Sequence, residues 1–237
     1  MAKKVVNLQQ DFESQSAEQL LRWAAESFFP KIAFASSFGA EDVAVIDLLS
    51  GIKPKISIFT LDTGRLPEET YEVMEQVRQR YGAEIVSFFP DKAAVEKLER
   101  EKGFYSFRQS VENRKECCGI RKVEPLNRAL AGLEAWVTGL RRGQAVTRAA
   151  LPKVEADAAH RGIAKINPIA DWSAEQVWEY IRKNQVPYNK LHDRNYPSIG
   201  CAPCTRAVRP GEEIRAGRWW WELPEHKECG LHVKPKS

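Results

Sequence analysis

Residues 31–49 read KIAFASSFGAEDVAVIDLL and join an apolar run, a small polar loop and a second apolar run. The first run, residues 31–35, directly follows Pro30 and predicts a short buried strand. Residues 36–42 supply two serines, a glycine and two acidic side chains, and the apolar residues 43–49 predict a helix. A strand that enters a helix through a small polar loop is the repeating unit of α/β proteins.

The same alternation continues along the chain. We predict strands at residues 55–59, 84–89, 135–138 and, at an edge of the sheet, 163–169, and helices at residues 67–80, 91–101 and 122–131. Two further helices begin at capping boxes, Ser16 with Gln19 and Ser173 with Gln176. This alternation predicts the α/β class, with a doubly wound, mostly parallel sheet. Residues 187–237 are rich in Pro, Gly, Trp and Arg, which predicts an irregular C-terminal segment.

The composition limits the class of protein. The formal net charge of +4 is too weak to indicate nucleic acid by itself, and an apolar fraction of 43% supports a folded core. The sequence has no run of about eighteen apolar residues and no signal-peptide stretch, so we expect no membrane span and a cytoplasmic location. Cytosolic thiols stay reduced, which favours metal ligation or catalysis over disulfide bonds.

The five cysteines divide into two close pairs and one single residue. Cys117 and Cys118 are adjacent, Cys201 and Cys204 form a Cys-x-x-Cys, and Cys229 lies near the C-terminus. Two close pairs far apart in sequence predict four thiolates at one metal centre, which suits Zn²⁺ and an iron–sulfur cluster about equally. Buried cysteines without a metal are the lesser alternative. The fifth thiol has histidines and lysines nearby, and such cations favour a reactive thiolate.

Three polar loops follow predicted strands, after Ala35, Thr60 and Thr138. Ligands of open α/β sheets bind outside the carboxyl ends of the strands, so we expect these loops to share one pocket. The loop at residues 36–42 opens a helix, whose N–H groups favour phosphate. An ordinary strand-to-helix turn explains that loop equally well.

Arginines concentrate in two segments of the chain. Arg141, Arg142 and Arg148 follow Gly139, and guanidinium groups bind oxyanions in bidentate fashion. A solvated basic loop is the simpler interpretation, but the position at a strand end favours anion binding. Residues 215–222 mix two arginines with three tryptophans, and we expect those tryptophans mainly to pack against other side chains.

Taken together, these segments resemble the assimilatory sulfonucleotide reductases, and more narrowly the iron–sulfur adenylyl-sulfate (APS) reductases. The motifs that carry the resemblance are SSFGAED at 36–42, LDTGR at 61–65, CCGIRK at 117–122, TGLRR at 138–142, GCAPCTR at 200–206 and ECGLH at 228–232. The first of them is similar to the relaxed PP-loop of adenine-nucleotide pyrophosphatases, so the resemblance implies a PP-loop, adenine-nucleotide-hydrolase-like sheet.

The resemblance also implies a cofactor, a nucleophile and a binding site. The cofactor is a [4Fe-4S] cluster on Cys117, Cys118, Cys201 and Cys204. The nucleophile is Cys229, whose attack on APS gives an S-sulfocysteine that thioredoxin or a similar dithiol discharges. The substrate-binding positions are Ser36, Leu61 and Gly139 near the adenosine, and Lys122, Arg148, Arg215, Arg218 and His232 at the phosphosulfate.

The expected organisation follows from these assignments. We expect residues 1–186 to form a nucleotide-binding α/β domain with the first cysteine pair, and residues 187–237 to carry the second pair and Cys229. We expect no nucleic-acid partner, and the sequence allows a homo-oligomer.

Three other functions are compatible with parts of the sequence. Reduction of 3′-phospho-APS uses the same scaffold, but most such relatives lack the four cluster cysteines. A PP-loop enzyme that thiolates tRNA should keep a Ser-Gly-Gly-x-Asp-Ser loop, whereas this chain has SSFGAE at residues 36–41. A zinc module could bind nucleic acid through the arginines and tryptophans of residues 215–222.

Overall fold

The computed structural model describes residues 12–145 and 148–223. By its internal contacts the chain divides into two compact units. Unit 1 comprises Met1–Thr60, Val73–Val86 and Leu130–Tyr188, and unit 2 comprises Leu61–Glu72, Ser87–Ala129 and Asn189–Ser237. The predicted division at residue 186 stays a prediction. Cys229 and His232 lie outside the described residues.

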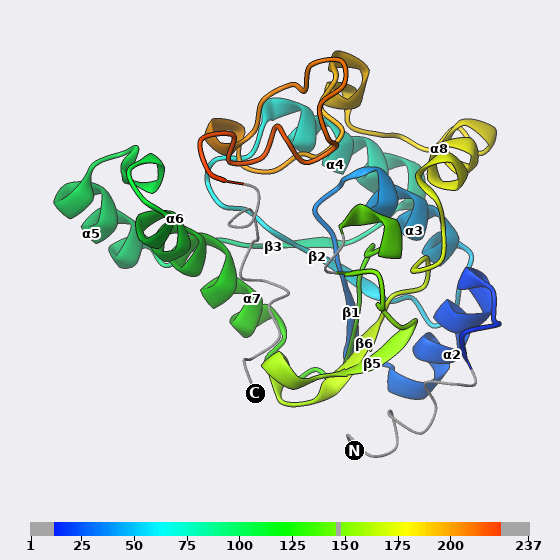
Figure 1. Ribbon diagram of the computed structural model, residues 1–237. Helices are drawn as coiled ribbons and strands as arrows, with labels where there is room; N and C mark the ends of the chain where they lie inside the picture. Colours follow the sequence, from blue (N-terminus) through cyan, green and yellow to red (C-terminus); the bar gives the residue numbers. More distant parts are fainter. Residues whose placement is uncertain (1–11, 146–147, 224–237) are drawn as a thin grey trace. The chain divides into compact units, whose positions relative to one another are not determined.

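The sheet has six strands in the order β3-β2-β1-β4-β6-β5 (Figure 1). Their bounds are β1 Ile32–Ala35, β2 Ser57–Leu61, β3 Ile85–Phe88, β4 Ala135–Val137, β5 Val154–Asp157 and β6 Ile163–Ile166. Strand β1 pairs in parallel with β2 and with β4, β4 pairs in parallel with β6, and β5 is antiparallel to β6. The predicted α/β class with a mostly parallel sheet is therefore confirmed.

Most of the helices follow the predicted pattern, and the helix at Val111–Cys118 was not predicted. They are α2 Ala17–Phe28, α3 Ala40–Ser50, α4 Glu68–Tyr81, α5 Lys92–Lys102, α6 Val111–Cys118, α7 Glu124–Ala129 and α8 Ala174–Lys183. Both capping boxes are present, at Ser16 with Gln19 and at Ser173 with Gln176. These local signals predict helix starts well because the bonds lie within one turn.

Two strand predictions were wrong in detail. The segment predicted at the sheet edge, now β6, lies between β4 and β5, and the edge strand is the unpredicted β5. The second predicted strand is shifted, so that β2 contains Leu61. The β5 sequence VEAD has two acidic residues in four positions, so its apolar content gave no strand signal.

The strand order reverses beside β1. The chain moves outward from β1 to β2 and then β3, and returns to the other side of β1 with β4. Such a reversal opens a crevice at the carboxyl ends of the two strands, where α/β proteins bind ligands. The loops that leave β1 and β4 begin at Ser36 and Thr138, so these polar segments sit where a ligand site is expected.

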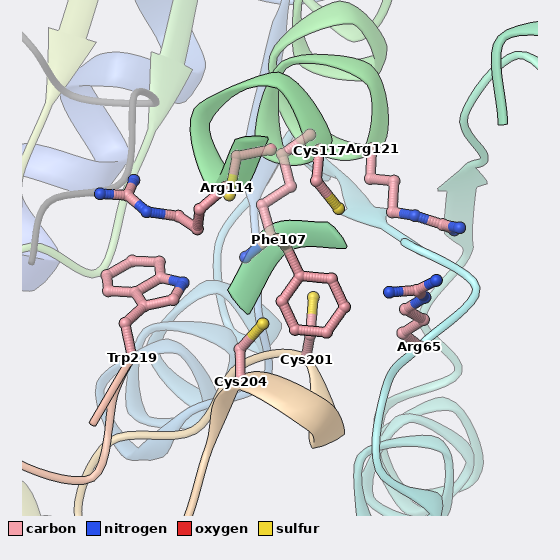
Figure 2. A pocket seen from close by; sticks show the side chains of 10 residues that line it. Arg65, Phe107, Arg114, Cys117, Arg121, Cys201, Cys204 and Trp219 are labelled. Atoms are coloured by element: carbon pink, nitrogen blue, oxygen red, sulfur yellow. The ribbon is translucent and has the colours of Figure 1, made fainter. Parts of the chain in front are cut away.

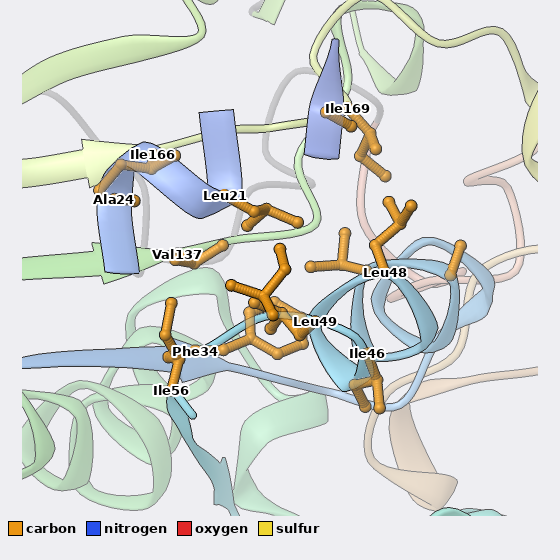
Figure 3. Close-up of a cluster of buried hydrophobic side chains, with 14 of the residues drawn as sticks. Leu21, Ala24, Phe34, Ile46, Leu48, Leu49, Ile56, Val137, Ile166 and Ile169 are labelled. Atoms are coloured by element: carbon orange, nitrogen blue, oxygen red, sulfur yellow. The ribbon is translucent and has the colours of Figure 1, made fainter. Parts of the chain in front are cut away.

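The core of unit 1 is apolar and fully buried. Leu21 of α2, Phe34 of β1 and Val137 of β4 are all completely excluded from solvent and belong to one cluster (Figure 3). Helix α3 packs against α2 and α8. Burying one such side chain contributes about 1.5–3 kcal/mol, so this core fixes the positions of the loops that follow β1 and β4.

Unit 2 contains a helical segment with an unusual turn. Helix α6 ends at Cys118, continues through a π-helical turn at Gly119–Val123, and leads into α7. Turns of this kind inside helices occur frequently at functional sites. Both predicted cysteines of the first pair thus lie at the end of a helix, immediately before this wider turn.

Candidate active site

The four paired cysteines line a single pocket in unit 2 (Figure 2). Each is buried and is not part of a disulfide. The other lining residues are Arg65, Phe107, Arg114, Arg121, Lys122 and Trp219. The prediction that the two distant pairs come together is therefore confirmed in geometry.

The second pair is held by a short, well-bonded turn. Cys201 precedes a 3₁₀ turn at Ala202–Cys204, and the Cys204 N–H donates to the Cys201 carbonyl at 2.9 Å. The Ala202 N–H donates to the Arg65 carbonyl at 2.8 Å, and the Thr205 hydroxyl donates to the Cys201 carbonyl at 2.9 Å. These backbone bonds aim both sulfurs at the pocket that the first pair lines.

The pocket is cationic. Arg65, Arg114, Arg121 and Lys122 line it, and no carboxylate of the described residues does. Two acids lie behind these cations. Glu99 bonds both Arg65, at 2.9 Å, and Arg121, at 2.7 Å. Glu222 binds Arg114 through two bonds of 2.9 Å. The four cationic side chains that line the pocket suit thiolate ligands and anions.

Burial favours the neutral form of two of the four thiols when nothing is bound. Burial raises the pKa of Cys117, against the opposing effect of Arg121 and Arg65. Burial likewise raises the pKa of Cys204 to about 12, with Lys122 and Arg218 acting in the opposite direction. Since metals bind thiolates, a metal group at this pocket must release these protons.

In the described part of the chain, no group of three or more His, Cys, Asp or Glu side chains is placed to hold a metal ion. The Cys201 thiol donates to the Thr63 hydroxyl at 3.3 Å, and the buried Arg121 Nε has no hydrogen-bond partner among the described residues. A polar atom buried without a partner is costly, so it points to a missing acceptor.

Two of the predicted phosphosulfate residues, Lys122 and Arg218, lie close to the same cysteines. Lys122 lines the pocket, and Arg218 stacks on Trp219 with 4.8 Å between its Cζ and the ring centroid. The guanidinium of Arg218 lies so close to Gly200 that an added Cβ there would meet its Nη2 at 2.2 Å. Arg215 also belongs to unit 2, as does Leu61 at its boundary.

The predicted residues of unit 1 are Ser36, Gly139 and Arg148. The Ser36 N–H donates to the Phe59 carbonyl at 2.9 Å, and its hydroxyl accepts from the Phe38 N–H at 3.1 Å. Arg148 donates to Gln144 at 2.5 Å. These contacts fix the loops, and the substrate role of the three residues stays a prediction.

Asp42 lies in the first turn of α3, and its side chain reaches back to the loop that leaves β1. Its carboxylate accepts from the Ser37 N–H at 2.6 Å and from the Ser37 hydroxyl at 2.8 Å. Burial raises its pKa to about 6, although the bonds from Ser37 oppose this shift. A Cβ at Gly139 would lie 2.1 Å from Asp42 Oδ1, so only glycine lets the loops after β1 and β4 approach this closely.

The arginine loop differs from the prediction. Arg141 is buried and donates to Glu41 at 2.7 and 3.0 Å, and Arg142 is paired with Glu13. Two of the three guanidinium groups expected to bind an anion are therefore neutralised by carboxylates far away in sequence, which the local pattern could not reveal.

Sequence reasoning missed several residues of the pocket, among them Arg114 and Phe107. A helical signal for Arg114 was available, because it precedes Cys117 by three positions and so shares its helix face. Phe107 had no such signal, since it comes from a separate turn at Ser106–Arg108.

Comparison with known proteins agrees with this geometry. The profile of the phosphoadenosine phosphosulfate reductase domain matches residues 31–207. A protein of Allochromatium vinosum named adenosine 5′-phosphosulfate reductase is 56% identical over 201 residues, which are 85% of this chain and 78% of that protein. A Burkholderia cepacia protein of the same name is 57% identical over 203 residues, 86% of this chain and 81% of that protein.

A solved structure is also similar. The phosphoadenylyl-sulfate (PAPS) reductase of Candida auris, in a phosphate complex, matches with a TM-score of 0.74 and 30% identity. The match covers 86% of this chain and 96% of that one.

The mostly parallel sheet with its reversed strand order defines an α/β protein of the type that binds ligands at the carboxyl ends of its strands, and unit 2 adds a pocket lined by cysteines. The chain belongs to the phosphoadenosine phosphosulfate reductase family.

Proposed function

We propose that this protein reduces adenosine 5′-phosphosulfate to sulfite and AMP, as an oxidoreductase of sulfate assimilation. The observation that carries the proposal is the cationic pocket lined by four buried cysteines, in a chain 56% and 57% identical to proteins named for this reaction. That pocket distinguishes it from relatives that lack these cysteines.

The cofactor of the proposal is a [4Fe-4S] cluster on Cys117, Cys118, Cys201 and Cys204. Two features support it: the four thiols line one pocket, and four cationic side chains line the same pocket. When bound, the cluster supplies a fixed centre of charge that ties the two cysteine pairs together. Lys122 lines the same pocket, and we assign it a position between cluster and phosphosulfate.

The reacting group of the proposal is Cys229. Its thiolate attacks the sulfur of the sulfate group, the bond from that sulfur to the bridging oxygen breaks, and AMP leaves with both electrons of that bond. The product is Cys229 bearing an S-sulfonate. Arg148, Arg215, Arg218, Lys122 and His232 stabilise the negative charge of the phosphosulfate, which would otherwise repel the thiolate.

The second half of the reaction needs an external dithiol, for which we propose thioredoxin or a similar protein. One of its thiolates attacks the Cys229 sulfur and displaces sulfite, and its second thiol then frees Cys229. The dithiol is oxidised to a disulfide, and sulfur passes from the sulfate to the sulfite level.

Ser36, Leu61 and Gly139 hold the adenosine in this scheme, and we propose that the reaction takes place in the cytoplasm. In the described part of the chain, no helix is long and apolar enough to cross a membrane.

The nucleophile is tested by intact-mass spectrometry after anaerobic mixing with APS. We expect a sulfite-sized adduct on the wild-type protein and none on Cys229→Ser. Cys204→Ser is the matched thiol control, since it removes a cluster position and keeps Cys229. Sulfite release by Cys229→Ser would overturn the assignment.

The cofactor is tested by iron and sulfide analysis of anaerobically purified protein. We expect both elements, with a brown colour, in the wild type and in Cys229→Ser, and their loss in Cys204→Ser. A colourless wild-type protein that contains zinc would contradict the cluster.

Reduction of PAPS is the second candidate, favoured by the name of the matching family profile and by the Candida auris structure. Competition between the two nucleotides for one enzyme sample decides between them. We expect a higher kcat/KM for APS, and equal values would indicate dual use. Release of pyrophosphate from ATP would instead indicate the tRNA-thiolating class.

A further inference from the structure

Unit 2 exposes an aromatic surface close to the end of the described chain. We call it the aromatic patch; it consists of Phe104, Tyr105, Arg108, Trp220 and Leu223. The exposed fractions are 68% for Phe104, 59% for Tyr105, 36% for Trp220 and 61% for Leu223. Exposed aromatic clusters of this kind commonly mark interaction sites.

Arg108 connects two aromatic members of the patch, Tyr105 and Trp220. Its Cζ lies 4.9 Å from the ring centroid of Tyr105 and 5.2 Å from that of Trp220. Its Nη2 donates to the Pro203 carbonyl at 2.9 Å. No carboxylate of the described residues forms an ion pair with this guanidinium. Arginine stacked between aromatic rings is a common anchor of protein interfaces.

The patch lies directly over the wall of the cysteine pocket. Phe107 lines that pocket (Figure 2), and the Cζ of Arg108 is 5.7 Å from its ring centroid. Trp221 packs on Phe107 with ring centroids 5.9 Å apart, and Trp220 contacts Trp221 at 4.7 Å. A layer of two buried or half-buried rings thus separates the exposed patch from the cysteines.

The chain length limits how far the proposed nucleophile can be from the patch. Leu223 belongs to the patch, and Cys229 follows six residues later. An extended chain covers at most about 3.5 Å per residue, so six residues span at most about 20 Å. A protein bound at the patch is therefore within reach of Cys229.

We propose that the aromatic patch is the docking site of the protein dithiol that discharges Cys229. The proposal rests on the proposed function. The partner it fits has an apolar surface beside its reactive thiol and a carboxylate that pairs with Arg108. A brief redox contact needs only a small interface, and a few aromatic and arginine anchors are enough to supply its affinity.

The test separates docking from chemistry. Wild-type and variant holoenzymes are first loaded with APS, so that Cys229 carries the S-sulfonate, and the loading is followed by intact mass. The adduct is then discharged either with dithiothreitol or with reduced thioredoxin at concentrations below saturation, and sulfite is measured over time.

The variants are Phe104→Glu and Arg108→Glu. Phe89→Glu is the matched control for the first, because Phe89 is 56% exposed and belongs to the same unit. Arg22→Glu is the control for the second, since it makes the same change of charge at an exposed position of α2. Iron content of each variant confirms that the holoenzyme is intact.

We expect both patch variants to slow discharge by thioredoxin about tenfold or more. Loading by APS and discharge by dithiothreitol stay at the wild-type rate, as does every step in the two controls. Unchanged discharge by thioredoxin in both patch variants would overturn the proposal. Slower loading would assign the patch to the reaction of APS with this chain, and would also overturn the proposal. A change from oligomer to monomer would assign the patch to contact with a second copy of the chain, with the same consequence. Failure of the wild type to form the adduct is a different result, which refutes the proposed function itself.

Discussion

The Asp42 side chain accepts hydrogen bonds from the loop that leaves β1, a loop whose polar groups were expected to contact a ligand. Its carboxylate accepts hydrogen bonds from the Ser37 N–H and hydroxyl, so these two donors of the loop before α3 are already used within the chain. Burial raises its pKa from 3.8 to about 6, so the folded protein binds this proton more tightly than the unfolded chain does. The stabilising effect is present below the unfolded pKa and is lost as the pH rises through about 6.

We predict that Asp42→Asn flattens the pH dependence of stability. Above about pH 6 the ionised carboxylate costs the wild type on the order of 2–3 kcal/mol, which the neutral amide avoids. Urea unfolding at a series of pH values measures the difference. The free energy of unfolding of the variant should increase relative to that of the wild type as the pH rises from about 4 to about 7.5. Parallel curves for the two proteins would contradict the raised pKa.

Among the elements of unit 2, helix α6 is tied to the last described segment by one buried ion pair. Arg114 of α6 and Glu222 form two bonds of 2.9 Å, with side chains only 1% and 3% exposed. The same guanidinium stacks on Trp219 at 4.8 Å. The pair therefore connects the helix of the first cysteine pair with the segment that follows the second.

We predict that Glu222→Gln destabilises the protein by about 3–5 kcal/mol, because it leaves the Arg114 charge buried and unneutralised. The double variant Arg114→Met, Glu222→Leu should lose less than the single variant, since it buries no charge. Denaturant unfolding of the wild type, single and double variants measures this. If the double variant is less stable than Glu222→Gln, the attraction between the Arg114 and Glu222 charges is what stabilises the wild-type protein.

At the scale of the whole molecule, the division into two units predicts separate responses to cofactor loss. The four cysteines all belong to unit 2, and burial raises the pKa of Cys117 and of Cys204, which favours the neutral form of these two thiols when nothing is bound. Unit 1 has a large apolar core of its own. Removal of the proposed cluster should therefore loosen unit 2 much more than unit 1.

Hydrogen exchange followed by mass spectrometry measures this effect. After iron removal by a chelator, we expect amides of α6 and of residues 198–206 to exchange about tenfold faster or more, with β1 and α3 unchanged. Cys204→Ser, purified without treatment, should reproduce the pattern. Equal acceleration in both units would show that the cysteine pocket stabilises the fold as a whole.

The sequence by itself determined much of this protein. Capping boxes, apolar runs and loop residues located the helices and most strands, and the spacing of the cysteines separated two pairs from Cys229. These signals are readable because they come from contacts within one turn or one strand.

Only the tertiary structure decided which distant residues meet. It placed β6 inside the sheet, paired Arg141 with Glu41, and brought Phe107 to the wall of the cysteine pocket. It also gathered the exposed rings around Arg108. Contacts between segments far apart in the chain depend on packing of the whole fold, and packing leaves no periodic pattern in the local sequence.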